Sequence, residues 1–334
     1  MTVRPTRSSA LDAALPERWG PLQRLKNTLI YWVIAVAMPL LLHLPLRLLR
    51  AFAAIVGAIA VRLPLADWRR AREHVALAFP DLSPREREVL VRRMVRHLAL
   101  TAAEMVRADV LLAPRGPVRL DDQQRALVQA ALAEGHGVVA VSGHLGNWEL
   151  MAQAMAAAGF PVTGIARPLY DPRITRLVHA ARTRFGMKLS WRGDSAVSKD
   201  MLRVFRQNEL LAMLIDQDTK VQGVFVPFFG KLAHTPSAAA ALALRFHAPI
   251  IVGWCHRTRE GYRIELHRHP FAPSGDDERD VLELTAQLTR RIEDAIRQAP
   301  EQWVWLHRRW KTQPPVPAAD TPDDNSAPAH RPRE

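Results

Sequence analysis

Residues 138–149 read VVAVSGHLGNWE, and this stretch decides the fold class. Its first four residues form a short apolar run of the kind that makes a buried strand. Gly143 and Gly146 follow and permit a tight bend with close approach by a ligand. A helix is expected from about Asn147 to Ala158. The stretch therefore predicts a strand, a tight turn and a helix, which together form the repeating unit of α/β proteins.

The same alternation continues on both sides of this unit. Ser83-Pro84-Arg85-Glu86 has a serine cap, a proline at the first helical position and a glutamate that completes a capping box, so a helix is expected to about Ala108. Further helices are expected at about 123–134, 174–184, 196–207 and 278–298, with another starting at 235–236, and strands at 162–165, 210–215, 250–255 and 262–266. The alternation predicts an α/β fold with a mostly parallel central sheet flanked by helices.

An apolar segment precedes this domain. Residues 28–46 read TLIYWVIAVAMPLLLHLPL and carry no acidic or basic charge apart from one histidine. The length is close to that of a membrane-crossing helix, and Tyr31 and Trp32 suit the interface between lipid and water. Arg47 and Arg50 come too early for a signal peptide that is cleaved after them. We therefore expect an N-terminal hydrophobic membrane-anchor helix that is retained.

The depth and orientation of the anchor stay open. Basic residues flank both ends, so the positive-inside rule gives no orientation. Pro39 and Pro45 permit a bent helix in one leaflet as well as a spanning helix, and a buried core helix is the remaining alternative. We divide the chain into a lead-in at 1–27, a hydrophobic membrane-anchor segment at 28–62, an α/β domain at 63–312 and a disordered tail at 313–334, which is rich in proline, alanine and aspartate.

Composition narrows the choice of partners. Of the 334 residues 48% are hydrophobic, which supports a large core and excludes general disorder. The net charge of +13 favours nucleic acid, anionic lipid headgroups or an acidic carrier protein, and charge alone does not choose among them. The single cysteine, Cys255, excludes a disulfide framework and a cysteine-based zinc site. Its apolar surroundings indicate a buried structural thiol.

Ionisable residues follow two expected strands, at the sheet edge where open α/β sheets bind ligands. His144 lies in the turn after the first strand and Glu149 in the first turn of the next helix. We expect Glu149 to accept a hydrogen bond from one ring nitrogen of His144, which leaves the other nitrogen free to take a proton from an alcohol. Asp216 and Asp218 either serve this site, cap the following loop or bind a metal. No further compact histidine–carboxylate cluster supports the metal.

The spacing of His144 and Glu149, an HX4E motif, resembles the histidine-plus-acidic signature of the lysophospholipid acyltransferase superfamily. Its glutamate resembles the lipid A late-acyltransferase branch, which contains the lauroyl and myristoyl transferases of Gram-negative envelope synthesis. Three later blocks are also similar to that branch: DQD at 216–218, FVPFFG at 225–230 and PEQWVWLHRRWKT at 300–312. The ordered blocks behind an apolar anchor extend the resemblance over about residues 25–312.

The resemblance implies roles for individual residues. His144 matches the catalytic base of the family and Glu149 matches its partner. Supporting or substrate-binding roles are expected for Arg182, Asp216, Asp218, Arg167 and Asn147. An arginine in such a site either stabilises an oxyanion or binds a substrate phosphate as a fork. No covalent nucleophile, cofactor or metal is required, because a thioester donor is already activated.

Each of two aromatic segments has more than one possible role. Residues 225–229 either line an acyl pocket or belong to the core. Residues 303–311 mix aromatic and basic side chains, a pattern that stacks on single-stranded nucleic acid or, beside a membrane anchor, lies among lipid headgroups and binds acceptor phosphates. Next to the anchor we expect the lipid interpretation and no nucleic-acid partner.

The resemblance implies an acyltransferase of lipid A biosynthesis. It would move a fatty acyl group from acyl carrier protein to a hydroxyl of a lipid A precursor of the Kdo-lipid IVA type. Because carrier-bound acyl groups are cytosolic, the catalytic domain is expected to face the cytoplasm at the bacterial inner membrane. Two alternatives remain: the same enzyme class acting on another membrane glycolipid or hydroxylated lipid, and a basic membrane-tethered binding protein.

Overall fold

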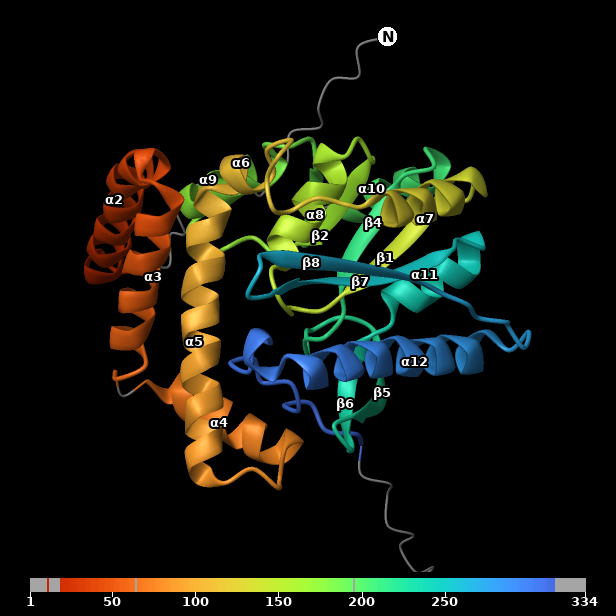
Figure 1. Ribbon diagram of the computed structural model, residues 1–334. Coiled ribbons are helices and arrows are strands. Elements are labelled where there is room, and N and C mark those ends of the chain that lie inside the picture. The colour runs from red at the N-terminus through yellow and green to blue at the C-terminus, as the bar shows by residue number, and fades with distance from the viewer. Residues whose placement is uncertain (1–10, 12–18, 64, 195, 316–334) are drawn as a thin grey trace, which may run out of the picture.

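The computed structural model describes residues 11, 19–63, 65–194 and 196–315 (Figure 1). The expected lead-in and tail therefore lie mostly outside the described residues. In chain order the elements are α2 (Pro21–His43), α3 (Leu46–Ala60), α4 (Ala66–Ala78), α5 (Pro84–Val106), α6 (Ala108–Leu111), α7 (Asp122–Ala133), β1 (Val138–Ser142), α8 (Trp148–Ala157), β2 (Val162–Ala166), α9 (Pro172–Thr183), β3 (Lys188–Trp191), α10 (Val197–Arg206), β4 (Leu210–Leu214), β5 (Gly223–Phe228), β6 (Lys231–Pro236), α11 (Ala238–Phe246), β7 (Ile250–Arg257), β8 (Tyr262–His269), α12 (Asp277–Gln298) and a 3-10 turn η1 (Pro300–Gln302).

The central sheet has the strand order β3-β2-β4-β1-β7-β8. The first five strands in this order pair in parallel, and β8 pairs antiparallel to β7. The neighbouring strands β4, β1 and β7 are distant from one another in the sequence. Parallel strands cannot be joined by a short hairpin, so helices lie between them in the chain. The predicted α/β class with a mostly parallel sheet is confirmed.

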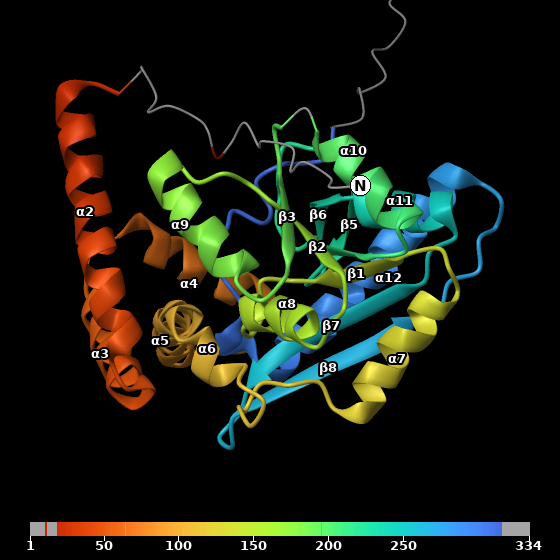
Figure 2. The ribbon, with the colours of Figure 1, turned by 90° about the horizontal axis from the view of Figure 1, so that it is seen from above.

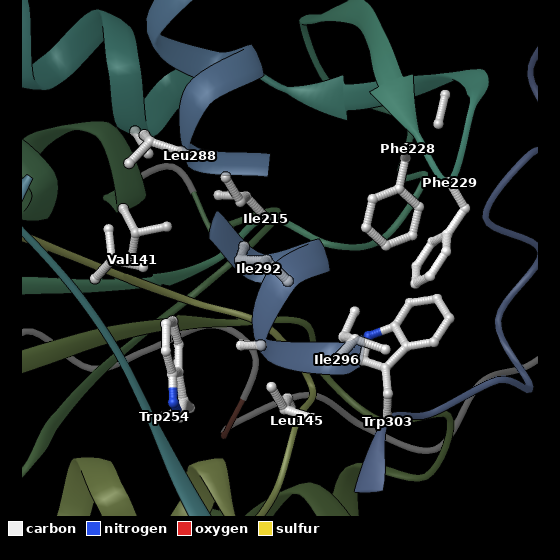
Figure 3. Close-up of a cluster of buried hydrophobic side chains, with 14 of the residues drawn as sticks. Val141, Leu145, Ile215, Phe228, Phe229, Trp254, Leu288, Ile292, Ile296 and Trp303 are labelled. Carbon is white, nitrogen blue, oxygen red and sulfur yellow. The ribbon is translucent and has the colours of Figure 1, made fainter. Parts of the chain in front are cut away.

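Helices cover both faces of the sheet because its strands are apolar on both sides. In β1, Val138 packs into one core cluster with α7 and α8, whereas Val139 and Val141 pack into the other with α10, α11 and α12. Figure 3 shows part of the second cluster, in which Ile292 and Ile296 of α12 lie near Leu145 and Trp303. Burial on both faces explains the continuous apolar runs of the strands.

The predicted start of α5 is confirmed in detail. The Ser83 hydroxyl accepts a hydrogen bond from the backbone N–H of Glu86, and the Glu86 carboxylate accepts one from the backbone N–H of Ser83. The basic residues 92, 93 and 96 of this helix are exposed. Asn147 caps α8 in the same manner by accepting from the N–H of Leu150 at 3.1 Å.

Some elements differ from the expectation. The expected anchor segment 28–62 contains most of α2 and all of α3, because the chain turns at Leu44 and Pro45 between these helices. The sequence pattern also missed α4, the edge strand β3 and the separate hairpin of β5 and β6. The helix expected from Thr235 begins later, at Ala238, because β6 continues to Pro236. One apolar N-terminal helix, α2, has the length and composition of a candidate membrane anchor.

Candidate active site

The turn between β1 and α8 contains two glycines in crowded surroundings, of which Gly146 cannot be replaced without a shift of the backbone. A Cβ atom on Gly143 would lie 3.1 Å from the carboxyl carbon of Asp216 and 3.0 Å from Ile292. Gly146 has φ +61, and a Cβ there would lie 2.0 Å from the carbonyl oxygen of Cys255. The two glycines thus allow residues 143–146 to pass between β4 and β7, and this brings the backbone of His144 against Asp216.

Strand register brings His144 and Asp216 together. β1 and β4 are adjacent and parallel, with Ser142 opposite Leu214, so each of the two residues lies two positions beyond the paired ends. Nδ1 of His144 lies 2.8 Å from Oδ1 of Asp216, and the backbone N–H of His144 donates to Oδ2 at 2.7 Å. The carboxylate therefore fixes both the backbone and the ring of His144.

Asp216 is 2% exposed and accepts a further hydrogen bond from the indole Nε1 of Trp303 at 2.7 Å. Burial would raise the pKa of this carboxyl, but the charge of the His144 ring and the hydrogen bonds from His144 and Trp303 outweigh burial and lower the pKa to about 2. Asp216 is thus ionised at neutral pH. An ionised acceptor at Nδ1 favours a proton on that nitrogen and leaves Nε2 of the neutral ring as a proton acceptor.

The prediction that Glu149 accepts a hydrogen bond from His144 is wrong. In the described part of the chain the partner of the ring nitrogen is Asp216, and Glu149 instead forms an ion pair with Arg182 of α9. Nε of Arg182 lies 2.8 Å from Oε2 of Glu149, and Nη2 pairs with Oε1. Glu149 begins α8 beside α9, so its side chain points toward that helix. Trp148 links the two groups, because its indole donates to Glu149 at 3.2 Å and its ring contacts the His144 ring edge-on at 5.1 Å.

Asn147 belongs to a second polar cluster on the other side of the turn. Its side-chain amide donates to Oε2 of Glu104 at 3.2 Å. The Glu104 side chain is 0% exposed and also pairs with Arg50 of α3 at 3.0 Å and with Arg257 of β7. His97 accompanies this cluster with Nε2 at 2.9 Å from the carbonyl oxygen of Gly146. Through Asn147 and the carbonyl oxygen of Gly146, this cluster holds the end of the turn between β1 and α8.

Among the described residues, Asp218 and Arg167 make no hydrogen bond or ion pair with His144. The Asp218 carboxylate accepts hydrogen bonds from the backbone N–H of Thr312 at 2.7 Å and from its hydroxyl at 3.0 Å, so it holds the C-terminal block in place. His307 of that block lies 3.0 Å from the carbonyl oxygen of Asp218. Arg167 is exposed at the end of β2. Of the seven predicted site residues, the contacts therefore join His144 with Asp216 and Glu149 with Arg182.

Three side chains of the 303–311 block are buried in the protein core. Trp303 and Trp305 are 1% and 0% exposed, and Arg309 is 0% exposed. Arg309 donates to the carbonyl oxygen of His234 at 2.6 Å and lies over the Phe228 ring, and burial lowers its pKa to about 10. Phe228 and Phe229 pack in the same core, where Figure 3 shows them beside Trp303. Arg308 and Lys311 are exposed and Trp310 is half-buried, so these members of the block reach the surface.

Sequence reasoning missed Glu104, Arg257, His97 and the role of Trp303. One signal for Glu104 is present, because it is the single charged residue between Leu98 and Val106. The partners of Glu104 come from helices and strands distant in the sequence, and no local pattern predicts them. In the described residues no group of three or more His, Cys, Asp or Glu side chains is arranged to hold a metal ion.

A family model described as bacterial lipid A biosynthesis acyltransferase matches residues 21–312. The chain belongs to this family. It is 24% identical to the lipid A biosynthesis lauroyltransferase of Escherichia coli (strain K12), over 85% of this chain and 92% of the relative. It is 27% identical to the lipid A biosynthesis myristoyltransferase of the same organism, over 90% and 89%. A phosphatidylinositol mannoside acyltransferase of Mycobacterium tuberculosis (strain CDC 1551 / Oshkosh) is 25% identical over 55% and 57%.

The family resemblance inferred from the four sequence blocks is confirmed by this match. Membership makes the protein an acyltransferase of lipid A biosynthesis, and it favours an enzyme over a binding protein. The His144–Asp216 pair and the Glu149–Arg182 pair are the candidate groups for its chemistry.

Proposed function

We propose that the protein transfers a fatty acyl group from acyl carrier protein to a hydroxyl of a lipid A precursor of the Kdo-lipid IVA type, with His144 as general base. The observation that carries the proposal is the 2.8 Å contact between Nδ1 of His144 and the ionised carboxylate of Asp216. The His144 side chain is 23% exposed, whereas that of Asp216 is 1% exposed. The ring therefore has one nitrogen held from inside and one edge open to a substrate.

The proposed step needs no covalent intermediate. Nε2 of His144 takes the proton of the acceptor hydroxyl as its oxygen bonds to the thioester carbonyl carbon. The tetrahedral oxyanion then collapses, the carbon–sulfur bond breaks, and the imidazolium returns the proton to the leaving thiolate. Asp216 stabilises the imidazolium while it exists, as the carboxylate does in a serine-hydrolase triad. The products are an ester and the free carrier thiol.

Arg182 is proposed to bind negative charge in this reaction. Glu149 engages Nε and Nη2 of its guanidinium, and within the described part of the chain Nη1 has no such partner. An arginine held in this way can stabilise the oxyanion or bind a phosphate of the acceptor. Glu149 is then a positioning residue for Arg182. The ion pair in two parallel contacts explains why a planar guanidinium is needed here and not an ammonium.

Charge and hydropathy support the proposed donor and location. The net charge of +13 is complementary to an acidic carrier protein. The candidate anchor α2 supports a location at the inner membrane, and we propose that the catalytic domain lies on the cytoplasmic side, where the carrier is present. Initial rates with the same acyl group on the carrier and on coenzyme A distinguish the donors, and a preference for the coenzyme A ester would contradict the proposal.

The acceptor has one alternative. A phosphatidylinositol mannoside acyltransferase is among the relatives, so another membrane glycolipid is the second candidate acceptor. Mass spectrometry of envelope lipids from a strain that lacks the gene separates the two. The proposal predicts loss of one acyl chain from lipid A, and an unchanged lipid A with an altered second glycolipid favours the alternative.

The role of His144 is tested by steady-state kinetics with His144→Ala. Loss of a general base should lower kcat by roughly 10²–10⁴-fold at an unchanged melting temperature. His136→Ala is the matched control, because His136 is exposed in the loop before β1 and should keep the rate of the parent enzyme. A rate within threefold of the parent (about 0.6 kcal/mol) for His144→Ala would remove the proposal.

A further inference from the structure

The exposure of α2 follows the period of a helix. Large apolar side chains recur every three or four positions along one exposed side: Leu22, Leu25, Leu29, Trp32, Val36 and Leu40, each at least 58% exposed. The opposite face is partly or fully covered, at positions 27, 31, 34, 38 and 41. One side of the helix is thus docked on the protein, and the other side is an apolar stripe.

Contacts hold α2 to the catalytic domain at both ends and between them. At the N-terminal end Trp19 stacks on Tyr170 with ring centroids 4.9 Å apart. Further along, Arg173 of α9 donates to the Thr28 hydroxyl at 3.2 Å and lies 4.6 Å from the Tyr31 ring centroid.

At the C-terminal end, Arg107 donates to the carbonyl oxygen of Leu44, just after α2. Leu41 packs there against the small cluster that contains Leu49 and Ala103. The whole length of α2 therefore lies along the domain, and Figure 2 shows it passing beside α9.

α3 presents a second apolar stripe. Leu49, Ala53 and Gly57 face α5, and a Cβ atom on Gly57 would lie 3.2 Å from Ala99, so the two helices are in close contact. The other side of α3 exposes large apolar residues at the same helical spacing: Leu48, Phe52, Ile55, Val56 and Ile59, each at least 44% exposed. Both views place α2 and α3 on the same side of the molecule (Figures 1 and 2).

We propose that α2 and α3 form a platform that lies in a single leaflet, so that α2 does not cross the bilayer. A 23-residue helix is long enough to span, since its length is about 34 Å. Its two ends, however, contact the same catalytic domain, and a spanning helix must place them on opposite sides of the membrane. This inference rests on the membrane location in the proposed function.

The charges next to α2 support the single-leaflet arrangement. Arg173 pairs with Asp171 at 2.7 Å and contacts α2 at Thr28, seven positions into the helix from Pro21. In a spanning helix this ion pair would lie just inside the headgroup level marked by Lys26, beside the apolar part of α2 where charged groups are costly. In a helix that lies flat, the pair stays at the headgroup level. Exposed Lys26 and Arg47 lie near the two ends of α2 and suit anionic headgroups.

The platform also has a consequence for the acceptor. α9 contacts α2 through Arg173 at one end and Glu149 through Arg182 at the other. The two positions are about 14 Å apart along the helix axis. A lipid in the leaflet beneath α2 therefore lies within one acyl-chain length of the candidate site, and the acceptor is taken from that leaflet.

Cysteine labelling in sealed membranes tests the topology. The native Cys255 is buried and its pKa is raised by burial to about 12, so the full-length parent chain gives little background with a membrane-impermeant maleimide. Gly20→Cys reports the N-terminal end of α2, and Glu260→Cys, in the exposed loop between β7 and β8, reports the catalytic domain. The proposal predicts that both react in vesicles of one orientation and that neither reacts in the other. Reaction of the two from opposite sides would overturn it.

Spin labels measure depth independently. Labels placed by Leu22→Cys, Leu29→Cys and Val36→Cys share one face of α2 and should show similar immersion below the phosphate level in vesicles with anionic lipid. A spanning helix instead changes depth by about 10 Å between successive labels. That gradient, or labels exposed only to water, would contradict the platform. Both measurements use resting enzyme and give the same result in His144→Ala, so they fail independently of the proposed chemistry.

Discussion

Two buried carboxylates flank the turn that carries His144, and they serve it in different ways. Asp216 and Glu104 are 2% and 0% exposed, and each accepts several hydrogen bonds. Asp216 holds a ring whose other edge reaches the surface, whereas Glu104 is enclosed by Arg50, Arg257 and Asn147. A buried charge with an open, titratable partner is suited to chemistry. A buried charge whose partners are all fixed is suited to holding a structure together.

Asp216→Asn should have the largest effect on activity. An amide at Oδ1 or Oδ2 would meet an N–H donor, so the His144 ring would lose its fixed tautomer and its charged partner. We expect kcat to fall by roughly 10²–10⁴-fold, similar to the loss of the base itself. Steady-state kinetics measures kcat of the variant, and an unchanged circular dichroism spectrum shows that the variant is folded.

Asp218→Asn is the matched control, two residues further along the chain. Its carboxylate binds Thr312 and not His144, so the change should cost about 1–3 kcal/mol of stability and less than tenfold in kcat. Equal losses of activity in the two variants would show that Asp216 acts only through the fold.

Glu104→Gln should give the opposite result. It leaves Arg50 and Arg257 without their buried counter-charge, which costs about 3–5 kcal/mol. We expect a large fall in the melting temperature, while kcat per folded molecule stays within tenfold of the parent. If the Glu104→Gln variant keeps the melting temperature of the parent but loses activity, Glu104 takes part in the reaction. The proposed difference between Glu104 and Asp216 would then be wrong.

A smaller effect is expected from pH. Burial, with the charge of Arg257, lowers the pKa of His97 to about 3, so the folded protein keeps this ring neutral while the unfolded chain binds a proton below about pH 6.5. Stability should therefore fall as the pH is lowered from about 6.5 toward 3, by about 1.4 kcal/mol per pH unit for this group. Asp216, with its pKa of about 2, contributes such a loss only below about pH 4.

His97→Asn should reduce that slope. Burial also lowers the pKa of His256 and His307, so part of the pH dependence remains. Thermal melting of both proteins between about pH 4.5 and 7.5, a range that includes the free-histidine pKa of about 6.5, measures the difference. If stability falls with pH equally steeply in the parent and in His97→Asn, His97 is not held neutral in the folded protein.

The sheet and the position of His144 could be predicted because both depend on local signals. The apolar run at 138–141, the glycines at 143 and 146 and the capping box at Ser83 each determine the structure of their own segment. The partner of His144 could not be predicted in the same way. Glu149 is near in sequence, but α8 turns it toward Arg182, and Asp216 reaches the ring because β4 is the neighbour of β1 in the sheet.

The anchor shows the same limit. Composition predicted an apolar N-terminal segment, and the structure has one in α2. Its break at Pro45 and its contact with Arg173 depend on elements that fold elsewhere in the chain. Local patterns therefore predict most of the helices and strands of the central sheet, and sheet order decides which side chains meet.

The central claim is that Asp216 holds the proton of His144 on Nδ1 and leaves Nε2 free as a base. Nitrogen-15 NMR of histidine-labelled protein measures this tautomer directly, with His144→Ala to assign the signal. For the neutral ring we predict protonated Nδ1 and unprotonated Nε2, and a shift toward the other tautomer in Asp216→Asn. A neutral ring with its proton on Nε2 in the parent enzyme would contradict the account.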